Sequence, residues 1–382
     1  MASIPFPKPP TSEAAETLRG EVRSFLDEVP ADRTPAERAL SWTGFDPDFS
    51  RLLAEKGWIA MTWPREYGGH ERSALERYVV LEELLAAGAP VSAHWIADRQ
   101  SGPLLLRYGS EAQRREILPR IAAGTCFFCI GMSEPDAGSD LAGVRTRATP
   151  VDGGWRVNGT KLWTSNAHRA HYMILFCRTA EVGENRHEGT SQLLVDLSTP
   201  GITIRPIRDM SGAADFNEVV FDDVFLPESA LIGQAGRGWS QVMGELAYER
   251  SGPDRWLSSF ALLVELARQL GRSPSEHAAE QFGRVTAHLV VLRRLSRSVA
   301  GMLERGEDPA LQASLVKDLG TQVEQDIPEI VRELVDVEAA PGSDEPLAAV
   351  LAHTLMYAPA FSLRGGTREI LRGIIARGLG VR

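Results

Sequence analysis

The sequence predicts an α+β protein that is mostly α, with a β-barrel or sandwich domain between two helical domains. Residues 11–125 keep helical hydrophobic periods, residues 126–235 form short β-prone runs between turn residues, and helical periods return from Gly238. The expected domains are a helical N-terminal domain at 1–125, a β domain at 126–237 and a helical bundle at 238–382.

Three helices are expected in the N-terminal domain. Residues 13–26 keep a helical period, and residues 75–87 form a strongly amphipathic segment. Residues 111–123 form the third helix, and Gly124 follows it where a helix C-terminus favours glycine.

The β domain is expected from six short apolar runs separated by turn residues such as Asn158-Gly159. These runs cover residues 127–132, 155–157, 172–177, 192–196, 202–204 and 218–221. Regularly spaced short strands are typical of a sandwich or barrel. The expected C-terminal helices cover residues 239–249, 256–270, 278–305, 310–338 and 347–382, with an interruption of the last at Gly365-Gly366.

Composition excludes several classes of protein. A net charge of −10 argues against nucleic-acid binding, which needs a basic surface. The chain has no apolar run of the ~20 residues that span a bilayer and no signal-peptide-like N-terminus, so we expect a cytoplasmic protein without membrane insertion. The three cysteines are too few for a disulfide framework, and Cys126 and Cys129 lie in a β-prone run as structural thiols. No metal site is expected.

Two motifs in the β domain carry the chemistry. Residues 132–140 combine Ser133 and Ser139 with a Pro/Gly turn, and residues 161–166 place Trp163 among small hydroxylic residues. Both motifs lie between apolar runs, so a β domain would present their hydroxyls, backbone N–H groups and one indole face together. This pattern indicates a planar, phosphate-bearing cofactor and therefore flavin redox chemistry.

The chain resembles the acyl-CoA dehydrogenases over nearly its whole length. Five blocks occur in the order of that family: 103–109 with 118–124, 134–140, 158–161 with 163–166, 221–227 with 236–239, and 366–370 with 374–377. The resemblance implies a helical N-domain, a β-barrel middle domain, a C-terminal four-helix bundle and FAD between the last two. It also implies an acyl-CoA thioester as substrate and an electron-transfer flavoprotein as electron acceptor. Homo-oligomers, dimeric or tetrameric, are the expected assembly.

The resemblance also assigns cofactor contacts. Met132 and Ser133 would contact the pyrimidine side of the flavin, and Ser139 would lie near the pyrophosphate or the pantetheine arm of the substrate. Trp163 would flank the isoalloxazine ring, and Ser165 would hydrogen-bond near N5.

The C-terminal signature adds further expected contacts. Thr367 would approach the flavin from the helical domain, and Glu369 is assigned to the cofactor site with it. Arg250 and Gly366 are assigned to the substrate.

The catalytic base is expected at an unusual position. Dehydrogenation at Cα–Cβ needs a base for the Cα proton, a hydride acceptor and donors to the thioester carbonyl. Most family members carry a glutamate directly before the Gly-Thr of the C-terminal signature, where this chain has Gly365. Isovaleryl- and long-chain-type relatives place the glutamate on an earlier helix ahead of an arginine, as Glu249 stands ahead of Arg250. We expect Glu249 as base, the backbone N–H of Gly365 as carbonyl donor, and Asp254 as the alternative base.

Two departures from the family pattern leave other functions open. Ala279 stands where the family often has a phosphate-binding arginine, and residues 336–346 replace its Gln…Gly-Gly segment. The chain could therefore be a flavin-poor or inactive partner subunit in a hetero-oligomer with a homologue. A flavin oxidase or monooxygenase on the same scaffold is a third hypothesis. Gly365 lacks a side chain, which favours a bulky or branched acyl group.

Overall fold

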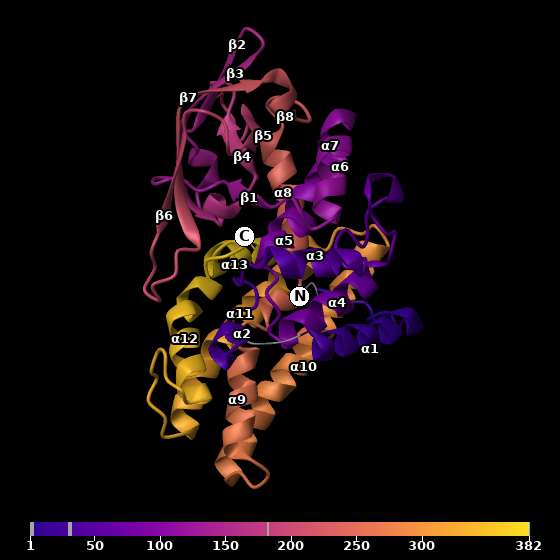
Figure 1. The fold of residues 1–382 in the computed structure, drawn as a ribbon, viewed down its shortest axis with the longest axis vertical. Helices are drawn as coiled ribbons and strands as arrows, with labels where there is room; N and C mark the ends of the chain where they lie inside the picture. The colour runs from indigo at the N-terminus through magenta and orange to yellow at the C-terminus, as the bar shows by residue number, and fades with distance from the viewer. Residues whose placement is uncertain (1–3, 30–32, 182, 382) are drawn as a thin grey trace. The chain divides into compact units, whose positions relative to one another are not determined.

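The computed structural model describes residues 4–29, 33–181 and 183–381, without the side chains of residues 245–249. It confirms the predicted fold class, with helices before and after a sheet-containing middle segment (Figure 1). In the described ranges, no helix is long and apolar enough to cross a membrane.

Seven α-helices precede the sheet in the described part of the chain. They are α1 (Glu13–Glu28), α2 (Pro35–Ala39), α3 (Pro47–Glu55), α4 (Ala74–Ala86), α5 (Ser92–Ile96), α6 (Gly102–Tyr108) and α7 (Glu111–Ala122). The three predicted helices are α1, α4 and α7, and each begins after a serine whose hydroxyl accepts a hydrogen bond from an N–H of the first turn. Gly124, just beyond α7, has a φ of 67°, the left-handed conformation that favours glycine there.

The middle segment forms one eight-stranded sheet in the order β6-β7-β3-β2-β4-β5-β8, with β1 pairing parallel to β4. The strands are β1 (Phe128–Gly131), β2 (Arg147–Val151), β3 (Gly154–Ser165), β4 (Tyr172–Arg178), β5 (Thr190–Asp196), β6 (Ile202–Ile207), β7 (Phe216–Pro227) and β8 (Leu231–Ile232). All six predicted runs are strands, and β2 and β8 are additional. Apolar side chains such as Val157, Leu175, Val195 and Val219 form its buried core.

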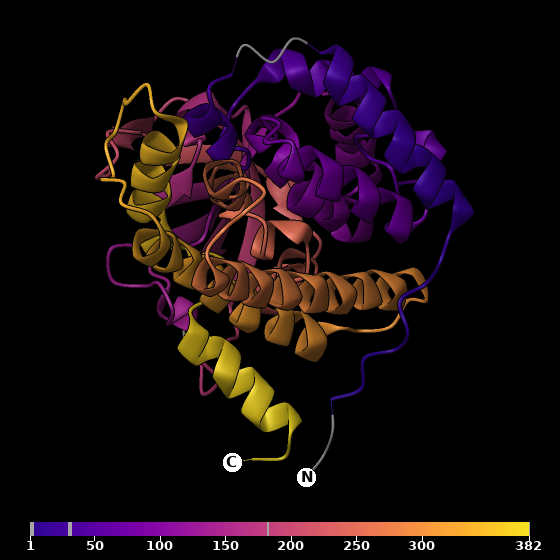
Figure 2. The same ribbon diagram turned by 90° about the horizontal axis from the view of Figure 1, so that it is seen from below.

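The C-terminal helices are α8 (Gly238–Glu249), α9 (Phe260–Leu270), α10 (Glu276–Glu304), α11 (Ala310–Leu334), α12 (Pro346–Phe361) and α13 (Arg368–Gly378). Figure 2 shows α10 and α11 as two long orange helices side by side. The predicted interruption lies between α12 and α13, where Gly365 and Gly366 have φ values of 69° and 97°. Both conformations are strained for residues with a Cβ, which explains two glycines in succession.

The chain divides into two compact units that do not follow the sequence order of the domains. One unit contains residues 1–45, 72–92 and 247–382, and the other contains residues 46–71 and 93–246. The N-terminal helices are therefore shared, with α1, α2 and α4 in the first unit and α3 and α5–α7 in the second.

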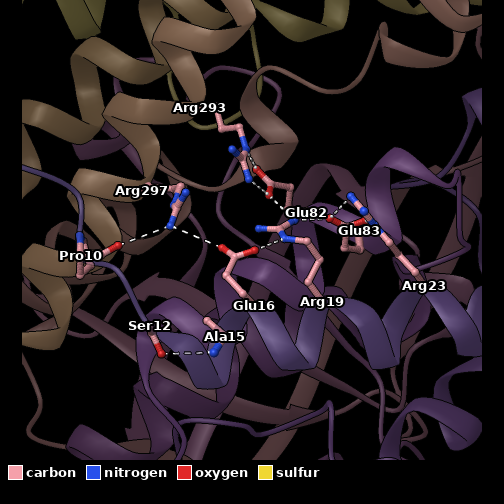
Figure 3. Close-up of polar contacts among 10 residues, drawn as sticks. All are labelled: Pro10, Ser12, Ala15, Glu16, Arg19, Arg23, Glu82, Glu83, Arg293 and Arg297. Atoms are coloured by element: carbon pink, nitrogen blue, oxygen red, sulfur yellow. Dashed lines mark hydrogen bonds and ion pairs between the residues drawn. The ribbon is translucent and has the colours of Figure 1, made fainter.

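A buried ion-pair network joins α1, α4 and α10 within the first unit (Figure 3). Arg19 of α1 donates to Glu82 at 2.8 Å and also to Glu83, both on α4, while Arg293 of α10 donates to Glu82 at 2.7 Å. Burial raises the pKa of Glu82, but the hydrogen bonds and charges of Arg293 and Arg19 outweigh it and keep the pKa below its usual value. The network thus fixes the α1–α4 pair against α10.

Candidate functional site

The two predicted cofactor motifs are neighbours in the second unit. Residues 132–140 follow β1, and residues 161–165 form the end of β3. The N–H of Leu162 donates to the carbonyl of Ser133 at 2.9 Å, which places the first motif alongside β3. Ser133 and Ser165 are both half-buried, so their hydroxyls lie near the surface.

A buried ion pair fastens these motifs together. Lys161 of β3 is fully buried, and its Nζ donates to Glu134 Oε1 at 2.7 Å and to the Met132 carbonyl at 3.1 Å. The Glu134 carboxylate also accepts the backbone N–H groups of Arg145 and Thr146 at 2.7 and 2.9 Å. Burial raises the pKa of Glu134, but Lys161 and these donors outweigh it, so the pKa is lowered and the carboxylate stays ionised.

Trp163 has the geometry expected of a platform for a flat ligand. Its backbone is left-handed, with a φ of 60°, and the β3–β7 register shifts between Lys161 and Thr164. Such a bulge redirects a side chain, and a left-handed bulky residue is rare outside strained or functional positions. Trp163 is 56% exposed, and its indole meets the edge of the Phe216 ring at a centroid distance of 6.2 Å. An exposed indole held in this way can offer its face to a planar ring.

Ser139 lies in the exposed part of the first motif. Its loop is held by exposed ion pairs from Asp136 to Arg145 at 2.9 Å and from Asp140 to Arg186 at 2.7 Å. The serine is therefore accessible to a ligand, and its loop makes an exposed ion pair on either side of it.

The C-terminal signature is built by separate contacts in the first unit. Arg250 Nε donates to the Gly365 carbonyl at 2.9 Å, and Lys317 Nζ donates to the Gly366 carbonyl at 2.8 Å. Thr367 is the N-cap residue of α13, and Glu369 is exposed in the first turn. The backbone N–H of Glu369 and the Thr367 hydroxyl hold the pKa of the Glu369 carboxyl below its usual value.

Glu249 is the last residue of α8, and its side chain lies outside the described part of the structure. Its neighbour Arg250 is buried, 4% exposed, and contacts Gly365 as described above. Asp254 is bound differently, because its carboxylate pairs with buried Arg255 at 3.0 Å. Ala279 lies exposed in the first turn of α10 and offers no charge.

Sequence reasoning missed three residues that build these motifs: Glu134, Lys161 and Lys317. Glu134 and Lys161 each stand inside a family block, which was the available signal. Their pairing needs β1 and β3 to be placed together, and no sequence periodicity gives that. Lys317 occupies a buried helix face, where a lysine is exceptional and so indicates a specific partner.

Comparisons with known proteins identify the family of the chain. Family models described as the N-terminal, middle and C-terminal domains of acyl-CoA dehydrogenase match residues 12–125, 129–224 and 236–380. Acyl-CoA dehydrogenase IpdE1 of Mycobacterium tuberculosis is 33% identical over 375 residues, covering 94% of this chain and 96% of that protein.

Solved structures show the same relationship. The structure titled Tcur3481-Tcur3483 steroid ACAD superimposes with a TM-score of 0.87 at 28% identity, covering 98% of this chain and 99% of that chain. A glutaryl-CoA dehydrogenase from Mycobacterium smegmatis in complex with FADH2 gives a TM-score of 0.81 at 25% identity, covering 97% of this chain and 95% of that chain. The chain therefore belongs to the acyl-CoA dehydrogenase family of FAD-dependent oxidoreductases.

Proposed function

We propose that this enzyme oxidises the Cα–Cβ bond of a bulky acyl-CoA thioester with Glu249 as the base. The observation that supports this assignment is the hydrogen bond from Arg250 to the Gly365 carbonyl. It brings the residue next to Glu249 against the glycine that replaces the usual glutamate. Glu249 therefore stands one residue before the arginine that contacts the vacated position.

The chain's own groups have separate tasks in this proposal. Glu249 takes the Cα proton, and a poorly solvated carboxylate is the stronger base because burial raises its pKa. The Gly365 N–H donates to the thioester carbonyl as enolate-like charge develops there. Arg250 holds the Gly365 peptide group in place. FAD, when bound, accepts the hydride from Cβ.

The residues of the second unit fit FAD because an exposed, left-handed Trp163 lies beside Ser165 at the end of β3. The neighbouring motif adds the proposed FAD contacts of Met132, Ser133 and Ser139. The start of α13 adds the proposed contacts of Thr367 and Glu369.

Trp163→Ala is expected to weaken FAD binding about tenfold or more, since stacking on an aromatic face contributes roughly 1–3 kcal/mol. Its Tm should change little because the indole is largely exposed. Titration of the apoprotein with FAD, followed by flavin fluorescence, measures the effect. Phe225→Ala, at an exposed aromatic of β7, is the control and should leave FAD affinity unchanged. Equal affinities for all three proteins would remove Trp163 from the cofactor site.

The acyl group is proposed to be polycyclic and steroid-derived. Gly365 has no side chain at the position where most family members carry a glutamate, and the structural neighbour cited above is titled a steroid ACAD. We expect kcat/KM for a steroid-derived acyl-CoA to exceed that for a short straight-chain acyl-CoA by about tenfold or more, because apolar contacts contribute ~1–3 kcal/mol per small group. A substrate panel with the wild-type protein measures this, and preference for short straight chains would contradict it.

A hetero-oligomer is the second candidate assembly. Ala279 removes a charged phosphate contact, residues 336–346 are largely irregular, and the steroid-related neighbour's title names two different chains. In such an assembly a homologous subunit supplies the missing FAD contacts. A chain purified alone would then lack FAD and gain it on mixing with the homologue, whereas a stable FAD-loaded homo-oligomer would exclude this assembly.

An electron-transfer flavoprotein is the proposed electron acceptor. Oxygen consumption in its absence would instead favour an oxidase.

A further inference from the structure

One face of α11 binds the whole turn between α12 and α13 in the first unit. Lys317 donates to the Gly366 carbonyl, Asp318 accepts from Arg368 at 2.9 Å, and Glu324 accepts from Arg364 at 3.1 Å. Lys317 and Glu324 are both 0% exposed. Burying charged groups is costly unless they are paired, so these contacts require a specific arrangement of the turn.

The contacts at Gly365 and Gly366 fix the direction of two successive peptide groups. In a trans peptide the carbonyl and the next residue's N–H point in opposite directions. The Gly365 carbonyl faces Arg250 and the Gly366 carbonyl faces Lys317, so the N–H groups of Gly366 and Thr367 point away from these cations. Among the described residues, neither N–H has a hydrogen-bond partner.

These two donors lie at the N-terminus of α13, an 11-residue helix. The helix dipole and the unpaired N–H groups together favour an anionic oxygen at this position. We infer that Lys317 is a positioning residue: it holds the Gly366 carbonyl and so directs the Thr367 N–H, beside that of Gly366, toward an anionic oxygen in the active site. This inference rests on the proposed function, in which the oxygen belongs to the thioester or to the diphosphate of FAD.

Lys317→Met tests this inference, because methionine has a similar shape but no donor. The matched control is Thr321→Val, one turn further along α11, which removes a buried hydrogen bond to the Phe361 carbonyl at 3.3 Å but leaves the glycine turn untouched. Each substitution removes a hydrogen bond to a backbone carbonyl in the segment 361–366, and the Tm of each variant is measured beside its activity. Lys317→Gln, which stays polar but is shorter, serves if methionine prevents folding.

Three readouts distinguish positioning from a structural role. A thioester oxygen predicts that kcat of Lys317→Met falls about 10- to 100-fold with little change in KM, and a diphosphate predicts a similar rise in the Kd for FAD. Either result supports the inference when Thr321→Val changes both values less than about threefold. Trypsin should also cleave Arg364–Gly365 faster in Lys317→Met than in the control, as mass spectrometry of the fragments would show.

The inference would be overturned if Lys317→Met matched Thr321→Val in kcat, in affinity for FAD and in the rate of cleavage after Arg364. A wild-type protein inactive toward every CoA thioester would instead contradict the proposed function. FAD affinity and the rate of cleavage would still decide the role of Lys317 in that case.

Discussion

Glu249→Gln is expected to lower kcat for acyl-CoA dehydrogenation about 10²- to 10⁴-fold, the usual contribution of a positioned general base. Glutamine keeps the size of the side chain but cannot accept the Cα proton. FAD content and KM should change little, because the substitution affects a step that follows binding. Steady-state kinetics with an electron-transfer flavoprotein or an artificial acceptor measures this change.

Asp254→Asn is the control for Glu249→Gln, since Asp254 is the alternative base expected from the sequence. Its carboxylate is paired with Arg255 at 3.0 Å, so we expect a loss of stability rather than of proton transfer. If Asp254→Asn abolishes turnover in a folded, FAD-loaded protein while Glu249→Gln stays active, the assignment of the base is wrong.

Lys161→Met is expected to destabilise the second unit by about 3–5 kcal/mol, because it leaves the buried Glu134 carboxylate without its cation. FAD should be lost at the same time, since this pair holds Ser133 and Trp163 in neighbouring positions. Urea unfolding and the FAD content of the purified variant measure the two effects. The double variant Glu134→Gln/Lys161→Met should recover part of the stability, because neither charge then remains buried.

Arg205→Met is the matched control for Lys161→Met. It breaks an ion pair of similar length, Arg205 to Glu218 at 2.7 Å, on the exposed side of the same sheet. Exposed pairs contribute only ~0–1 kcal/mol, so FAD content and stability should change little. Equal effects of Lys161→Met and Arg205→Met would show that the buried pair does not organise the site.

The stability contributed by Glu134 should also depend on pH. Its folded-state pKa lies below the usual glutamate value because Lys161 and two backbone N–H groups bind the ionised form. The contribution is therefore fully present above the pKa of an unfolded glutamate and is lost as the pH falls through the lower folded value.

The sequence predicted the fold class and the main helices because hydrophobic periods and turn residues are local signals. It did not predict β2, where Pro150 and two further exposed residues hide the strand pattern, or β8, which has only two residues. It also did not predict the division into two units, since that division depends on contacts between distant segments. Glu82 illustrates this. A charged residue in an amphipathic helix is usually exposed, but Glu82 is buried and paired with Arg19 and Arg293.

The candidate site could be predicted only in part for the same reason. The sequence motifs identified the residues that are proposed to face ligands, including Trp163, but not the left-handed backbone of Trp163. Two buried lysines support these residues: Lys161 binds Glu134 of the first motif, and Lys317 binds the Gly366 carbonyl of the C-terminal signature. Both partners lie far along the chain from the lysine that binds them. Their roles follow from the three-dimensional arrangement.

The most direct test of the proposed function is anaerobic mixing of the protein, purified by itself, with a steroid-derived acyl-CoA while the visible absorbance of FAD is followed. The proposal predicts stoichiometric FAD whose visible band bleaches in the wild-type protein and persists in Glu249→Gln. A folded wild-type chain whose FAD is not reduced by any acyl-CoA, or bleaching at equal rates in both proteins, would contradict it.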